Sequence, residues 1–146
     1  MIDAYLDAAD QITIVRKGEQ AEDVNDLAVI QEDEFLSIAK TEDKGSYITV
    51  WLEHPISLDH FTNIRFGAGR FPLQMGKYIL SIEFDLKYST DKQMGATYSK
   101  DHTIFRVFAP TVVQCRLILD GQAYNMDKIG GYFEKIIKQD CHGKYY

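Results

Sequence analysis

The sequence predicts an all-β protein built from two tandem antiparallel β-sandwich domains. Apolar residues occur in short runs that alternate with polar residues or are rich in β-branched and aromatic residues, and long apolar stripes at helical spacing are missing. These runs recur about every ten residues, with turn-forming residues between them. Nine Tyr and eight Phe in 146 residues also favour strands over helices.

The first domain is predicted to span residues 1–88. Its candidate strands are Gln11–Lys17, Leu27–Ile30, Phe35–Ala39, Ser46–Pro55, the run "NIRFGAG" and Lys77–Tyr88. Glu42–Gly45 predicts a turn. The dipeptide His54-Pro55 ends the strongest strand, because Pro lacks a backbone donor and the residue before it avoids helical geometry.

Residues 89–94 are polar and without pattern, so they predict a linker, and the second domain is predicted to span residues 95–146. Its first strand places Phe105 and Val107 on one face and Arg106 on the other. We therefore expect Val107→Asp to cost several kcal/mol and Arg106→Ser to cost within about half a kcal/mol.

The rest of the second domain alternates between apolar and polar residues. Val113, Cys115, Leu117 and Leu119 form one face of the next strand. Asp120-Gly121 predicts a hairpin turn and Gly130-Gly131 a second turn. The run "YFEKIIK" predicts a further strand. With few residues left to pair with it, this run and the terminal "KYY" are expected to leave an open sheet edge, which favours self-association.

Composition and charge limit the partners and the location of the protein. A net charge of -6 argues against nucleic acid or an anionic membrane as a partner. No signal peptide begins at Met1 and no apolar run approaches the length of a membrane span. Two cysteines do not make a disulfide framework. We therefore expect a cytoplasmic protein.

The motifs that could suggest catalysis or metal binding lack the partner residues or the spacing that these functions require. "GAGR" (Gly67–Arg70) lacks the Lys-Ser/Thr and the helix that a phosphate cradle requires, so it predicts a turn. Adjacent Cys141 and His142 point apart on an extended chain. The four histidines lack metal-ligand spacing, and the acidic clusters "EDE" and "TED" resemble solvated turns. We expect no catalytic residue, no metal site and no cofactor.

Aromatic side chains offer one functional possibility. Apolar faces of sugar rings stack on exposed aromatic rings while polar neighbours bind the hydroxyls. The candidate carbohydrate-binding residues are Trp51, Tyr124, Tyr132 and Phe133. The alternative for each of them is packing in the core.

The segment "MGATYSKDHTIFRVFAPTVVQCRLIL" resembles the segment that opens the Ig-like module of type I pullulanases. The family pattern is Leu-Gly-Ala-x-Tyr-Ser/Thr, a polar turn, Thr-x-Phe-Arg/Lys-Val-Trp-Ala-Pro and an apolar strand. The matching residues are Gly95, Ala96, Tyr98, Ser99, Thr103, Phe105, Arg106, Val107, Ala109 and Pro110.

Two further segments extend this resemblance. "GGYFEKIIKQDCHGKYY" is similar to Gly-Val-Trp-x-Val…Gly-Asp-Leu-His-Gly-x-Tyr-Tyr of the same family, and "HPISLDHF…LQMGKYI…FDLKYSTDKQMG" to the preceding β-rich domain. Phe108 and Phe133 stand where the family has Trp, and Tyr88-Ser89-Thr90 replaces a Tyr-Asp-Gly. Phe can keep the packing role of Trp at both positions.

The resemblance implies a non-catalytic N-terminal part of a multi-domain hydrolase of α-1,6 links in pullulan, glycogen or limit dextrin. The catalytic carboxylates of the family lie on a (β/α)₈ barrel that follows the Ig-like module. Residues 95–146 would then be the first part of a family-48-type carbohydrate-binding module, truncated, and the chain a fragment without hydrolase activity of its own. The implied partners are α-glucan and the catalytic barrel of the same polypeptide.

Two other functions are open on the sequence. A protein–protein interaction scaffold without glucan affinity would have the same strands and would differ only in failing to bind glucan. A self-contained enzyme is disfavoured, because no set of catalytic residues is evident.

Overall fold

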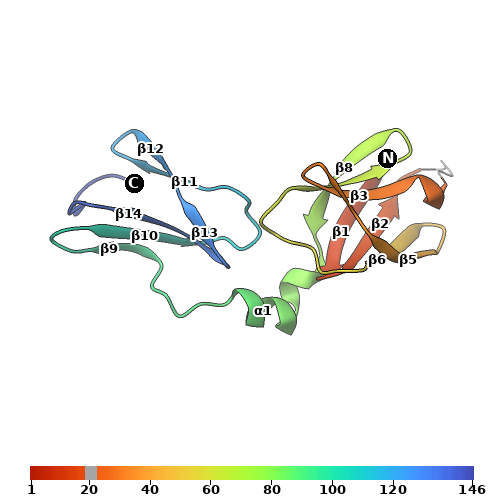
Figure 1. The fold of residues 1–146 in the computed structure, drawn as a ribbon, viewed down its shortest axis with the longest axis horizontal. Coiled ribbons are helices and arrows are strands. Elements are labelled where there is room, and N and C mark those ends of the chain that lie inside the picture. Colours follow the sequence, from red (N-terminus) through yellow and green to blue (C-terminus); the bar gives the residue numbers. More distant parts are fainter. Residues whose placement is uncertain (19–22) are drawn as a thin grey trace. The chain divides into compact units, whose positions relative to one another are not determined.

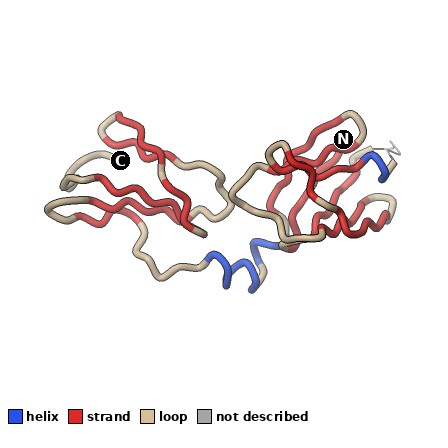
Figure 2. The backbone as a smooth tube through the Cα atoms, viewed as in Figure 1, coloured by secondary structure: helices blue, strands red, loops and turns tan. Residues whose placement is uncertain are grey.

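A computed structural model of the chain describes residues 1–18 and 23–146. The chain divides into two compact units, Met1–Asp85 and Leu86–Tyr146 (Figure 1). Strands are the main regular structure of both units, and helical segments are short (Figure 2). The predicted all-β fold is therefore confirmed. In the part of the chain that the structure describes, no helix is long and apolar enough to cross a membrane.

In the described residues of unit 1, eight strands form one sheet with the order β4-β3-β7-β8-β1-β2-β6-β5. The strands are β1 (Ile2–Ala8), β2 (Gln11–Arg16), β3 (Leu27–Gln31), β4 (Glu34–Leu36), β5 (Ile38–Asp43), β6 (Tyr47–Leu52), β7 (Thr62–Phe66) and β8 (Gly69–Met75), with a 3-10 turn η1 (Val24–Asp26) before β3. β1 and β8 pair in parallel, and the other pairs of this sheet are antiparallel. β1 is a strand that the sequence analysis did not anticipate.

Alternation along β1, β2 and β6 separates the core face of unit 1 from an outer face. The core-facing side chains of these three strands are Ile2, Ala4, Leu6, Ile12, Ile14, Ile48, Val50 and Leu52, all of them buried. On the outer face, Tyr5 lies opposite Thr13, and Thr13 lies opposite Thr49. The outer face therefore carries hydroxyl-bearing and aromatic side chains across neighbouring strands.

The predicted strand Lys77–Tyr88 is wrong. This segment forms a 3-10 turn, η2 (Lys77–Leu80), followed by the helix α1 (Ile82–Tyr88). The Ser81 hydroxyl accepts the N–H of Phe84 at 3.1 Å and caps the helix. The rings of Tyr78 and Phe84 pack edge to face with centroids 5.2 Å apart, and both side chains are buried.

Unit 2 contains a four-stranded sheet with the order β13-β14-β10-β9 and a separate hairpin β11-β12. The strands are β9 (Gly95–Tyr98), β10 (Thr103–Phe108), β11 (Arg116–Leu119), β12 (Gln122–Asn125), β13 (Asp127–Ile129) and β14 (Tyr132–Ile137). Both predicted turns are confirmed. At the hairpin, Asp120 and Gly121 have φ angles of 48° and 82°, a conformation that Asp and Gly tolerate. Residues 89–94 contain neither helix nor strand.

The expectation that "YFEKIIK" lacks partner strands is wrong. β14 lies inside the sheet and pairs with β10 on one side and with β13 on the other. The terminal "KYY" also has contacts within unit 2. The N–H of Asp120 donates to the Tyr145 carbonyl at 3.0 Å, and the Tyr146 ring packs on Phe105 with centroids 5.0 Å apart.

The hydrophobic core cluster of unit 2 is small. Its buried members are Phe105, Leu117, Leu119, Ile137 and Cys141. Val107, two residues beyond Phe105, is 41% exposed. The Arg106 Nε donates to Glu134 Oε2 at 2.7 Å, and both of these side chains are largely buried. The expected order of the two substitutions is therefore wrong, since Val107 is exposed and Arg106 is held in a shielded ion pair.

Candidate functional site

The four predicted carbohydrate-binding residues are divided between the two units. Trp51 belongs to unit 1, and the other three belong to unit 2. Tyr132 and Phe133 are 9% and 1% exposed, and Tyr124 packs against the core of unit 2. Their placement favours packing for these three residues. A sugar contact at any of the four stays a prediction.

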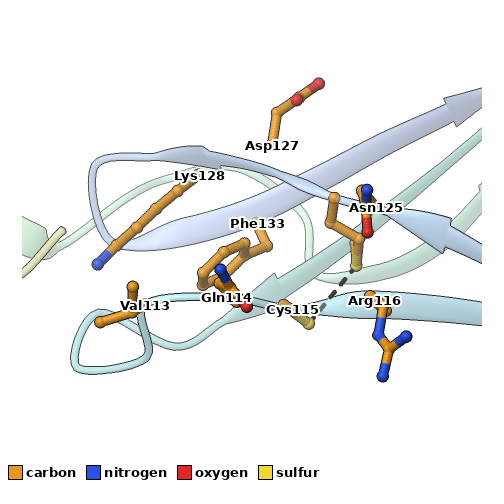
Figure 3. Close-up of a pocket in the computed structure, with 9 residues that line it drawn as sticks. Val113, Gln114, Cys115, Arg116, Asn125, Asp127, Lys128 and Phe133 are labelled. Atoms are coloured by element: carbon orange, nitrogen blue, oxygen red, sulfur yellow. Dashed lines mark hydrogen bonds between the residues drawn. The ribbon is translucent and has the colours of Figure 1, made fainter. Parts of the chain in front are cut away.

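Unit 2 has a polar pocket of about 640 Å³ near Phe133. Its lining side chains extend in different directions, with Asp127 pointing away and Arg116 and Lys128 lying far from each other (Figure 3). The Lys128 ammonium donates to the Pro110 carbonyl at 3.2 Å and lies 5.9 Å from the centre of the Phe133 ring. Because its charged groups do not converge, this pocket has no evident ligand.

The stronger candidate is an open groove of about 900 Å³ on the outer face of unit 1, which we call the sheet groove. It crosses the neighbouring strands β1, β2 and β6, and the chain from the end of β8 to η2 borders it. The lining residues are Tyr5, Asp7, Gln11, Thr13, Val15, Arg16, Ser46, Tyr47, Thr49, Met75, Gly76, Lys77 and Leu80. The groove follows from strand alternation, because its residues on β1, β2 and β6 lie at every second position, apart from Arg16 at the end of β2.

Internal hydrogen bonds fix one end of the sheet groove. The Thr13 hydroxyl donates to Asp7 Oδ2 at 2.6 Å, and the backbone N–H of Lys77 donates to Asp7 Oδ1 at 2.9 Å. The N–H of Gly76 donates to the Leu6 carbonyl at 2.9 Å. Asp7 therefore ties β1, β2 and η2 together, and each of its oxygens keeps lone pairs for a further donor.

Arg16, which lines the groove, and its neighbour Lys17 have charged partners within the protein. The Arg16 guanidinium binds Asp43 through two N–H groups at 2.8 and 3.0 Å and also donates to the Gly45 carbonyl at 2.7 Å. The hydrogen bond from Arg16 lowers the pKa of the Asp43 carboxyl. Lys17 forms an ion pair with Asp3, and this hydrogen bond raises the pKa of Lys17. The hydroxyls and aromatic faces of the groove fit a polyol.

Trp51 lies on the same outer face of β6 as Tyr47 and Thr49 but does not line the sheet groove. The Lys40 ammonium lies 4.9 Å from the centre of its ring, a cation–π geometry that occupies one face. The groove itself was missed by the sequence analysis. The sequence signal for the groove is that its residues occupy every second position of two strands, which turns their side chains to the outer face. These residues are Tyr5 and Asp7 on β1 and Gln11, Thr13 and Val15 on β2.

The described residues also show how the other motifs are used. "GAGR" spans the turn from β7 into β8, as predicted. Cys141 is fully buried, its N–H donates to the Thr103 hydroxyl at 2.9 Å, and the neighbouring His142 packs on the Tyr98 ring. Among residues 1–18 and 23–146 no group of three or more His, Cys, Asp or Glu side chains is arranged to hold a metal ion.

No protein-family model matches the chain. Among curated proteins, it is 27% identical to the pullulanase of Bacillus subtilis (strain 168), over 99% of this chain and 22% of that protein. The chain thus spans about a fifth of that relative's length.

The fold matches solved pullulanase structures. The crystal structure of pullulanase type I from Bacillus subtilis str. 168 complexed with maltose aligns with a TM-score of 0.81 at 22% identity, over 98% of this chain and 22% of that chain. The pullulanase of Anoxybacillus sp. LM18-11 complexed with maltotriose aligns with a TM-score of 0.74 at 25% identity, over 96% and 22% of the two chains.

Proposed function

Because this chain shares its sequence motifs and its fold with type I pullulanases, we propose that it is the non-catalytic N-terminal part of such an enzyme and that it binds α-glucan. The matched relatives are several times longer than this chain, which supports its being one region of a larger enzyme. In this proposal the larger enzyme hydrolyses α-1,6 branch links. Binding or positioning of glucan, or bracing of the catalytic barrel, would be the contribution of this region.

The sheet groove is the observation that carries the glucan-binding proposal. A linear glucan presents apolar C–H faces and rows of hydroxyls. Tyr5 and Tyr47 supply aromatic surface, and the Tyr47 side chain is 42% exposed. Thr13 and Thr49 supply hydroxyl groups next to the two tyrosines, and Asp7 supplies a carboxylate two residues beyond Tyr5 on β1. Related pullulanases have been solved with maltose, maltotriose and maltotetraose, which supports an α-glucan as the ligand.

We expect the chain to bind maltotriose or maltotetraose and Tyr5→Ala to weaken that binding about tenfold or more. Titration followed by NMR chemical shifts would measure both affinities. Phe35→Ala is the matched control, because Phe35 is an exposed aromatic residue of unit 1 that lies outside the groove. Equal loss in both variants, or shifts confined to unit 2, would place the ligand elsewhere.

The interaction scaffold is the alternative, and the same titration separates the two functions. A chain that leaves maltotetraose, pullulan and glycogen unbound at millimolar concentration would support the scaffold. Affinity gel electrophoresis with each polysaccharide in the gel gives an independent readout for the long glucans.

We also expect no hydrolysis of pullulan by the chain alone. A retaining glycosidase needs two carboxyl groups about 5 Å apart in a shaped cleft. Asp7 is the carboxylate that lines the sheet groove, and its oxygens already accept hydrogen bonds from Thr13 and Lys77. Reducing ends released above a blank by the purified chain would contradict this expectation.

A further inference from the structure

Two exposed arginines lie opposite each other on neighbouring strands of unit 1. Arg65 of β7 and Arg70 of β8 are partners in the antiparallel register, and both side chains are exposed. Residues paired in this way have their Cβ atoms about 4.5–5.5 Å apart on one face of the sheet. Like charges directly opposite each other destabilise a strand pair, so this arrangement costs unit 1 some stability.

The surroundings of the two arginines do not compensate this repulsion. In the part of the chain that the structure describes, no carboxylate forms an ion pair with either guanidinium. The neighbouring positions on the same face carry uncharged side chains, namely Ala28 on β3, Asn63 on β7 and Pro72 on β8. Arg16 differs, because it forms two hydrogen bonds to the Asp43 carboxylate.

Protection of a sheet edge does not explain the two charges. Charges of that kind are found on edge strands, where they discourage pairing with other chains. β7 lies between β3 and β8, and β8 lies between β7 and β1, so both are interior strands. Local arrangements that cost stability without a structural gain are typical of functional sites.

An aromatic ring orders one of the two guanidiniums. The Arg65 guanidinium carbon lies 5.4 Å from the centre of the Phe35 ring, a cation–π geometry. Because this contact restricts the Arg65 side chain before any ligand binds, less conformational freedom is lost on binding. The Arg70 guanidinium donates no hydrogen bond within the described residues, so its donors are available to a ligand.

We propose that Arg65 and Arg70 bind a phosphate dianion, either free or as the monoester of a small molecule. The planar fork of N–H donors on each guanidinium fits phosphate oxygens. A phosphate monoester carries a charge of about −1.5 to −2 at pH 7 and so balances both arginines, whereas one carboxylate balances one of them. The net charge of −6 disfavours a polyanion, which favours a ligand with a single phosphate group. Neither arginine lines the sheet groove, so the proposal does not depend on glucan binding.

Titration with inorganic phosphate and with glucose 6-phosphate at low salt tests the proposal, with backbone NMR shifts as the readout. We expect saturation in the millimolar range, with the largest shifts on β7 and β8. Arg65→Gln and Arg70→Gln should each weaken binding about tenfold or more. Arg116→Gln is the matched control, because Arg116 is an exposed arginine of unit 2. Equal affinity for the two probes would identify the phosphate group alone as the ligand, and tighter binding of glucose 6-phosphate would identify a monoester.

A stability measurement separates loss of the site from loss of folding. Arg70→Gln removes the repulsion and breaks no ion pair, so in the absence of phosphate the thermal midpoint of unit 1 should be unchanged or higher. Trp51 fluorescence reports this midpoint, because the tryptophan belongs to unit 1. Glucose 6-phosphate should raise the midpoint of the unchanged chain and not that of Arg70→Gln.

Four results would overturn the proposal. The first is a set of shifts that spread over the Lys and Arg residues of both units without saturating. The second is an equal loss of affinity in Arg116→Gln, and the third is a lower midpoint in Arg70→Gln without phosphate. The fourth is tighter binding of a tetraglutamate peptide than of either phosphate probe, since carboxylates of a protein segment would then be the partner.

Discussion

Phe105→Ala should lower the free energy of unfolding of unit 2 by about 3–5 kcal/mol and leave unit 1 folded. Phe105 is 2% exposed and belongs to a small hydrophobic cluster with buried Leu117, Leu119, Ile137 and Cys141, so few neighbours can close the space left by its ring. The Tyr146 ring would lose its edge-to-face partner as well. Since single domains are stable by about 5–15 kcal/mol, this loss is a large fraction of the total. Urea denaturation of the variant would measure it.

Two neighbours on β10 serve as controls for this prediction. Val107→Ala should cost within about 1 kcal/mol, because the side chain is half exposed. Arg106→Ser should cost about 1–3 kcal/mol, because it leaves the shielded Glu134 carboxylate without its hydrogen-bond donor. If Val107→Ala destabilised unit 2 more than Phe105→Ala, the face of β10 that contacts the core would have been assigned wrongly.

Gly76→Ala should destabilise unit 1 by about 1–3 kcal/mol and disturb the end of the sheet groove. A Cβ at this position would collide with the Asp7 carboxylate and would lie 2.9 Å from the Leu6 carbonyl oxygen and 3.0 Å from the Tyr5 Cβ. Two of these three contacts are with the backbone or the first atom of a side chain, which cannot move away easily. Thermal unfolding would report the loss of stability, and titration with maltotetraose the effect on the groove.

Gly69→Ala is the control for the substitution at Gly76. The new Cβ would there approach the outer atoms of the Phe71 ring at 2.6 and 2.7 Å. A ring edge can rotate aside, so we expect a smaller cost than at Gly76. Equal destabilisation by the two substitutions would show that the backbone around Gly76 yields as readily as a side chain.

The strands β10, β11 and β14 of unit 2 could be predicted from sequence because local signals decide them, whereas β9 and β13 were not predicted. Asp120-Gly121 and Gly130-Gly131 form two turns. The alternation of apolar and polar residues around Leu117 and Leu119 places both leucines on the buried face of β11. The exposure of Val107 could not be predicted in this way. Alternation tells which face a side chain is on, but whether another layer covers that face depends on the rest of the fold.

The helix α1 was mistaken for a strand because the apolar residues of its segment fit both the two-residue period of a strand and the 3.6-residue period of a helix. Apolar residues occur at every second position from Tyr78 to Tyr88, which imitates a strand. Phe84 and Tyr88, which are buried, are also four residues apart, and Ser81 is a good N-cap. The capping residue was the signal that favoured a helix.

The sheet groove could not have been assembled from the sequence alone. Tyr5, Thr13 and Thr49 are adjacent only because β1 pairs with β2 and β2 with β6, in the register that places all three in one row. Strand register depends on long-range pairing, and a shift of one residue would turn these side chains into the core. The aromatic residues chosen from sequence were instead mostly those that the core uses.

The burial of Cys141 gives the two units separate chemical reporters of unfolding. Both cysteines of the chain lie in unit 2, and its single tryptophan, Trp51, lies in unit 1. Thiol-labelling reagents will reach Cys141 when unit 2 opens, while Trp51 fluorescence responds to the state of unit 1. One denaturation series on the unmodified chain can thus follow both units, and a difference between the two transitions would reveal how far each unit folds independently of the other.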